Sequence, residues 1–99
     1  MPAYVVLFRE EPVHTPSEYE EYLRLQPPPP PTLKPLVVYG AQEALEGDPP
    51  DAVVLLEFPT RDDAREWYNG PYKEAAKHRQ AAAKYRGVIV DGWDGTIPG

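Results

Sequence analysis

Hydrophobic and polar positions alternate along the chain in a way that predicts four short strands and two amphipathic helical segments. Apolar runs of four to eight residues, bounded by Gly, Pro or Asp, are typical of strands, and they occur at 4–9, 36–39, 52–58 and 86–91. Apolar residues spaced three and four apart are typical of helices, and they occur over 16–25 and 61–85. The predicted order is strand, helix, strand, strand, helix, strand.

The run AVVLLEF at 52–58 is apolar at every position except Glu57. Its alternate positions place Val54, Leu56 and Phe58 on one face, and Val53, Leu55 and Glu57 on the other. A strand that is apolar on both sides needs cover on both sides, which predicts a central place in the sheet. The run at 4–9 has the same character.

Both helical segments begin at recognisable capping sequences. Thr15 and Glu18 have the spacing of a capping box, with Pro16 at the first helical position. Thr60 and Asp63 repeat that spacing before the second segment. We therefore expect helices to start at residues 16 and 61.

The second helical segment is interrupted by Asn69-Gly70-Pro71. Gly70 is expected to adopt the left-handed conformation that often ends a helix, and Pro71 suits the first turn of the next one. The following helix is expected to run to about residue 85 and to be followed by the last strand, at 86–91.

Five consecutive prolines, at 27–31, end the first helix. We interpret them as a stiff polyproline II connector of roughly 15 Å. The alternative is that this segment is a ligand for a domain with an aromatic groove, but no flanking basic residues support such binding. The strand at 36–39 is expected to bend at Gly40 and continue over 41–45. The turn at 47–51 then predicts an antiparallel hairpin with the central strand.

These elements together predict one α+β domain spanning residues 1–99, with a ferredoxin-like βαββαβ order, an antiparallel sheet and a tail at 92–99. Two helical segments can cover only one face of such a sheet. Because the other face is also apolar, we expect a homodimer formed through it, with Trp93 and the tail crossing onto the partner.

The chain resembles a known bacterial family along nearly its whole length. The resemblance is carried by Leu56-Glu57-Phe58-Pro59-Thr60, Ala64, Trp67-Tyr68, Pro71, Tyr72 and Arg79. These residues resemble domain-of-unknown-function family 1330, of the dimeric α/β-barrel superfamily. The resemblance implies a ferredoxin-like fold and a dimer, but no activity. Relatives in the wider superfamily are cofactor-free oxygenases, isomerases or haem proteins. The chain departs from the family at 27–35, where members usually continue the first helix to a Tyr-Gly-Gly turn.

Composition narrows the partners and cofactors. The 99 residues carry a net charge of −6 with scattered cations, which disfavours nucleic acid as a partner. No apolar run has membrane-spanning length, so we expect no membrane partner and a cytoplasmic location. There is no cysteine for a thiolate site. His14 and His78 lack any spacing that joins them, so neither a metal nor a cofactor is expected, and haem is the least supported.

Arg79 is the most unusual candidate for a site residue, because it lies on the apolar stripe of its helix. That stripe contains Tyr72, Ala75, Ala76, Ala82 and Ala83. A buried guanidinium needs a partner, which could be the carboxylate of Glu57, a carbonyl group or a ligand anion. The first two possibilities need no ligand.

We expect any pocket to lie between the sheet and the helices, lined by Tyr22, Trp67, Tyr68, Tyr72 and Arg79. Such a pocket suits a small anion, such as a carboxylate or enolate, with Glu57 as the candidate proton acceptor. Trp67 and Tyr68 could instead be core residues.

Three functions fit this pattern. The first is a small-molecule-binding homodimer, which could be an enzyme. The second is a structural or interaction dimer without a ligand. The third is a ligand-sensing module, which would need a DNA-binding partner domain that the sequence lacks.

Overall fold

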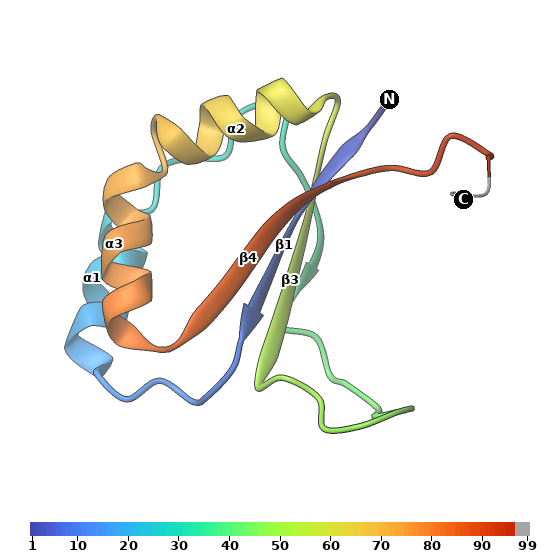
Figure 1. Ribbon diagram of the computed structural model, residues 1–99. Helices are drawn as coiled ribbons and strands as arrows, with labels where there is room; N and C mark the ends of the chain where they lie inside the picture. The colour runs from blue at the N-terminus through green and yellow to red at the C-terminus, as the bar shows by residue number, and fades with distance from the viewer. Residues whose placement is uncertain (97–99) are drawn as a thin grey trace.

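The computed structural model describes residues 1–96 of the chain. Its elements are β1 (Ala3–Arg9), α1 (Pro16–Leu25), β2 (Lys34–Val38), β3 (Ala52–Phe58), α2 (Arg61–Asn69), α3 (Lys73–Ala82) and β4 (Tyr85–Asp91). Within this described part, the strands form one four-stranded antiparallel sheet in the order β2-β3-β1-β4 (Figure 1). The order confirms the predicted ferredoxin-like α+β fold.

The sheet has an inner face beneath the helices and an outer face on its other side. The inner face of the two central strands carries Ala3, Val5, Leu7, Ala52, Val54, Leu56 and Phe58, all of them buried. The alternating burial in β1 and β3 confirms the predicted assignment of their two faces.

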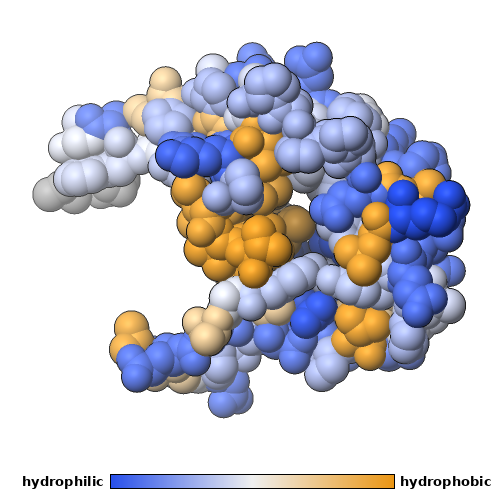
Figure 2. Space-filling model, turned by 180° about the vertical axis from the view of Figure 1, so that it is seen from behind, coloured by the Kyte–Doolittle hydropathy of each residue, from blue (hydrophilic) through white to orange (hydrophobic). Residues whose placement is uncertain are grey.

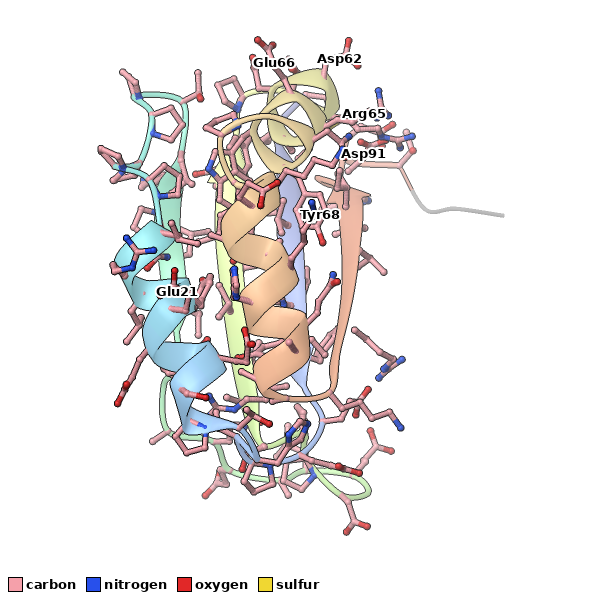
Figure 3. All side chains as sticks on the ribbon, turned by 90° about the vertical axis from the view of Figure 1, so that its left-hand side faces the viewer. Glu21, Asp62, Arg65, Glu66, Tyr68 and Asp91 are labelled. Atoms are coloured by element: carbon pink, nitrogen blue, oxygen red, sulfur yellow. The ribbon has the colours of Figure 1, made fainter. Side chains whose placement is uncertain are left out.

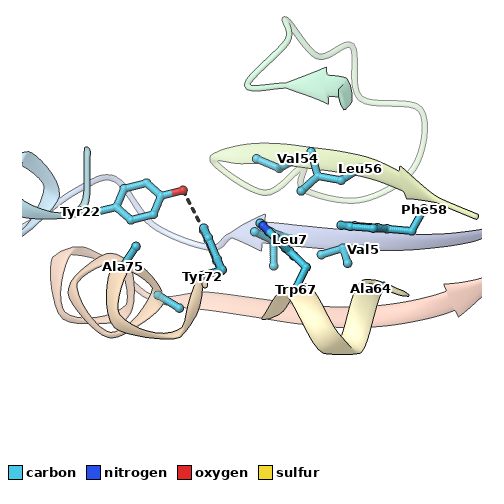
Figure 4. Close-up of a cluster of buried hydrophobic side chains, with 11 residues drawn as sticks. Val5, Leu7, Tyr22, Val54, Leu56, Phe58, Ala64, Trp67, Tyr72 and Ala75 are labelled. Atoms are coloured by element: carbon cyan, nitrogen blue, oxygen red, sulfur yellow. Dashed lines mark hydrogen bonds between the residues drawn. The ribbon is translucent and has the colours of Figure 1, made fainter. Parts of the chain in front are cut away.

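The three helices do not contact the sheet equally. α2 contacts β1, β3 and β4, whereas α1 and α3 pack chiefly against each other, side by side (Figures 1 and 3). Aromatic rings lie between this helix pair and the sheet (Figure 4). The rings of Trp67 and Tyr72 stack with centroids 4.2 Å apart, and Trp67 lies 5.4 Å from Phe58 on β3.

One of the two predicted capping boxes is formed. The Thr60 hydroxyl accepts a hydrogen bond from the Asp63 backbone N–H at 3.1 Å, which confirms the start of α2. The prediction for Thr15 is wrong, since its side chain makes no cap to α1. Its hydroxyl is instead 2.8 Å from His14 Nδ1, and Pro16 occupies the first turn as predicted.

Gly70 separates α2 from α3, but not in the predicted left-handed conformation. Its φ and ψ are −107° and −108°. A Cβ atom at this position would lie 2.7 Å from the Glu66 carbonyl oxygen, so the close approach of backbone to backbone is what requires glycine. The Tyr72 N–H donates to the Trp67 carbonyl across the bend at 3.2 Å.

The strand over 34–38 differs from its prediction in both length and bend. It begins at Lys34, carries its irregularity between Pro35 and Val37, and ends at Val38, so the predicted extension over 41–45 is wrong. Tyr39 has a φ of 54°, which is unusual for a bulky residue and directs the chain out of the strand. The bend therefore occurs one residue before Gly40.

The other boundaries are close to expectation. α3 ends at Ala82, about three residues early, because Ala83 is already extended with a φ of −161°. β4 accordingly begins at Tyr85 instead of residue 86. In the predicted 92–99 tail, Trp93 is exposed, and residues 97–99 lie outside the described part.

Gly70→Ala tests the steric role of this glycine. We expect it to lower the free energy of unfolding by about 1–3 kcal/mol, because the methyl group meets a backbone oxygen that cannot move independently. Gly40→Ala is the matched control, since its new methyl group would have only Val37 Cγ1 nearby, at 3.7 Å. Urea denaturation of both variants gives the comparison, and equal stability of the two would contradict the steric explanation.

Candidate functional site

Two cavities open between the sheet and the helices, where a single pocket was predicted. The larger, of about 780 Å³, lies between α1, the 27–39 segment and the inner face; we call it the tyrosine-pair cavity. The smaller, of about 290 Å³, lies between α3, the end of α2 and β4; we call it the Arg79 cavity. The backbones of α1 and α3 are close chiefly to each other and less to the sheet, which leaves space above the inner face.

The predicted site residues are divided between the two cavities. Tyr22, Trp67 and Tyr72 line the tyrosine-pair cavity. Arg79 and Tyr68 line the Arg79 cavity, and Figure 3 shows Tyr68 between α3 and β4. Leu7 contributes to both, so the inner face of β1 forms a common floor.

Arg79 faces inward, as the helical spacing predicted, and is 2% exposed. Its Nε and Nη1 atoms have no hydrogen-bond partner among residues 1–96. The guanidinium carbon lies 4.5 Å from the ring centroid of Tyr85 and 5.9 Å from that of Tyr72. These rings offset part of the desolvation of the cation, but they do not replace its missing hydrogen bonds.

Glu57 is not the partner of Arg79, so the ion pair, one of the three possibilities left open by the sequence, is not formed. Glu57 lies on the outer face, directly across from Tyr4 on β1 and Lys34 on β2. Arg79 packs above the inner face, with the thickness of the sheet between them. The sequence suggested Glu57 as a proton acceptor in the pocket. Because Glu57 lies on the other face of the sheet, it cannot have this role in the Arg79 cavity of its own chain.

The missing side chain of Gly87 helps to open the Arg79 cavity. Gly87 pairs with Leu7 across the β1–β4 ladder, on the inner face. A Cβ atom there would lie 2.8 Å from Leu7 Cδ2, so any side chain would intrude on the floor of the cavity. Gln80 and Tyr68 form the opposite wall, where the Gln80 amide donates to the Tyr68 hydroxyl at 3.3 Å.

A pair of buried phenols gives the other cavity its name. The hydroxyls of Tyr22 and Tyr72 are 2.7 Å apart (Figure 4), and the Gln26 amide donates to Tyr22 at 3.3 Å. Burial raises the pKa of Tyr22 and of Tyr72 above the ordinary phenol value, although the Arg79 charge opposes this rise at Tyr72. Both phenols therefore stay protonated at neutral pH and can donate hydrogen bonds.

A second phenol pair was not predicted. The hydroxyls of Tyr39 and Tyr85 are 3.0 Å apart, and the Arg9 guanidinium carbon lies 4.8 Å from the Tyr39 ring centroid. Burial, followed by the bond to Tyr85, raises the pKa of Tyr39. No sequence signal marks this pair, because the inward direction of Tyr39 depends on its positive φ.

The described residues hold no evident metal site or membrane span. Within residues 1–96, no group of three or more His, Asp or Glu side chains comes together so as to hold a metal ion. No helix in that same range has the length and apolar character needed to cross a membrane.

The fold and its two inner cavities define a ferredoxin-like α+β protein with room for a ligand. The model of one protein family, described as "Domain of unknown function (DUF1330)", matches residues 2–93. The chain therefore belongs to this family, which confirms the resemblance found in the sequence. A search among curated proteins finds no match. Family membership assigns no activity.

Replacing Arg79 tests whether it has a structural partner. We expect Arg79→Met to lower the free energy of unfolding by no more than about 1 kcal/mol, because the change strands no buried carboxylate and removes unsatisfied donors. Urea denaturation measures this difference. A loss of about 3 kcal/mol or more is typical of a broken buried ion pair and would show that Arg79 has a structural partner.

Proposed function

We propose that the protein is a homodimer that binds a small anionic molecule beside Arg79. The observation that carries the proposal is the buried guanidinium with two unpartnered nitrogen atoms at the edge of a cavity. Buried polar groups in folded proteins are nearly always satisfied, so an unsatisfied cation indicates a position for an external acceptor. A carboxylate or enolate suits the fork-shaped donors of arginine.

The other groups around this cavity support the same ligand class. Tyr68 accepts a hydrogen bond from Gln80, which leaves its own hydroxyl hydrogen free to donate. The volume of about 290 Å³ is at the small end of the range for ligand pockets. We expect a molecule of a few carbon atoms, held by the guanidinium and by the Tyr68 hydroxyl.

The outer face of the sheet supports the dimer. One cross-strand row there consists of Val88, Val6, Leu55 and Val37, which is apolar across all four strands. Figure 2 shows apolar side chains in a hollow between two projecting segments, residues 92–96 and the loop between β2 and β3. A second copy related by a two-fold axis would cover this face with an identical row.

A structural dimer without a ligand is the alternative function. It is favoured by the apolar outer face, which would support association whether or not the cavities are filled. The ligand-sensing alternative remains a proposal that needs a partner domain. We also propose a cytoplasmic location, compatible with the absence of cysteine, and a connector role for residues 27–31, which join α1 to β2.

Binding of small carboxylates tests the proposed site. We expect pyruvate, succinate or benzoate to raise the melting temperature of the wild-type protein, and Arg79→Met to abolish that rise. Arg65→Met is the control, because Arg65 is an exposed cation whose partner on α2 is Asp62. An equal rise in wild type and Arg79→Met, or no rise with any of the three acids, would contradict the anion site.

A charge on the outer face tests the dimer. Val88→Lys is expected to give a species of one chain mass, 11.1 kDa, whereas the wild-type protein has twice that mass by light scattering. Leu23→Lys is the control, because Leu23 is 52% exposed, close to the 54% of Val88, but lies on the helical side. A wild-type mass of one chain at micromolar concentration would rule the dimer out.

A further inference from the structure

The tyrosine-pair cavity is separate from the Arg79 cavity and differs from it in chemistry. Its volume of about 780 Å³ lies within the range of small-molecule pockets. None of the described residues that line it carries a charged side chain. Burying an ion in such surroundings without a counter-charge is strongly unfavourable, so the cavity suits an uncharged occupant.

Apolar and aromatic groups form most of this cavity. Leu7, Val54 and Leu56 provide the floor on the inner face. The stacked rings of Trp67 and Tyr72 form one side, and the prolines at 27–29 form another. Because a proline backbone has little freedom to lose, this wall is formed before a ligand arrives. Aromatic walls favour a flat molecule that contacts the rings by face or edge.

The buried pair of Tyr22 and Tyr72 has one hydrogen-bond donor left over. The hydroxyls of Tyr22 and Tyr72 carry two hydrogens, and their mutual bond uses one of them. The Gln26 amide donates a hydrogen bond to the Tyr22 hydroxyl, so this contact does not accept the second phenol hydrogen. The two side chains are only 5% and 2% exposed, which restricts the access of bulk water to the second hydrogen. An acceptor atom inside the cavity would satisfy it.

The rim of the cavity also points to an apolar occupant. Val38 and Leu23 line the cavity yet are 59% and 52% exposed. They lie on β2 and α1, at opposite sides of the opening. Apolar side chains at the entrance would be partly covered by a ligand that fills the interior.

We propose that the tyrosine-pair cavity binds a neutral, flat, mainly apolar molecule with one hydrogen-bond acceptor, such as an aryl ketone. The acceptor receives the spare phenol hydrogen of the Tyr22–Tyr72 pair, and the apolar body fills the space between the inner face and the proline wall. This site does not depend on anion binding at Arg79, since the two cavities share only Leu7 among the described residues.

A fluorescent aryl ketone provides the direct test. The uncharged probe 6-propionyl-2-(dimethylamino)naphthalene is expected to bind the wild-type protein saturably, with its emission shifted to shorter wavelength. In the double variant Tyr22→Phe, Tyr72→Phe, we expect binding about three- to tenfold weaker, the range typical of one lost neutral hydrogen bond. Because both hydroxyls are removed together, neither tyrosine is left with a buried hydroxyl that lacks a hydrogen-bond partner, so we expect the variant to fold.

Variants at the entrance show where the probe binds. Val38→Trp is expected to weaken binding at least tenfold by narrowing the opening, whereas Leu45→Trp should have no effect, because Leu45 is 88% exposed and does not line the cavity. Arg79→Met should retain saturable probe binding, because Arg79 contacts the Tyr72 ring but does not line this cavity.

Four results would overturn the proposal. The first is the absence of saturable binding, and the second is equal binding by the Val38→Trp and Leu45→Trp variants. The third is unchanged affinity in the double phenylalanine variant, which would show that binding does not need a hydrogen-bond acceptor on the ligand. Loss of probe binding in Arg79→Met would place the probe in the other cavity and would also contradict it, without bearing on anion binding there.

Discussion

The stack of Trp67 on Tyr72 connects the sheet to all three helices. Trp67 belongs to α2 and packs on Phe58 of β3, while Tyr72 directly precedes α3 and forms a hydrogen bond with Tyr22 of α1. The centroid distance of 4.2 Å requires the chain to bend sharply between the two rings. Gly70 permits this bend, since a side chain there would collide with the Glu66 carbonyl. The aromatic contact and the glycine therefore depend on each other.

This connection explains why the protein has cavities at all. Because the rings hold α3 and its neighbour α1 away from the inner face, aliphatic side chains do not fill the whole interior. Small buried alanines on α3, such as Ala75 and Ala76, let α3 pack closely against α1. The large Arg79 side chain extends into this space, with ring faces beside it and two nitrogens unpartnered. The incomplete core and the unsatisfied cation have the same origin.

The sequence predicted the inward position of Arg79 correctly, because helical periodicity decides which residues share a face. It could not predict the partner of Arg79. Glu57 is a charged residue in an apolar strand, but the helices cover the opposite face of that strand, with Val54 and Leu56, so Glu57 lies on the outer face. Tyr39 and Tyr85 were not foreseen, because one turns inward through a positive φ and the other begins a strand where helix was expected.

The order of the elements, the apolar character of both faces of β1 and β3, and the family could all be predicted, because they depend on local periodicity and on residue identities. The division of the expected pocket into two, with Tyr22 and Trp67 in one and Tyr68 and Arg79 in the other, became clear only from the packing between elements. The distance between helices and sheet depends on how rings stack across three elements, and no pattern within a single element records that distance.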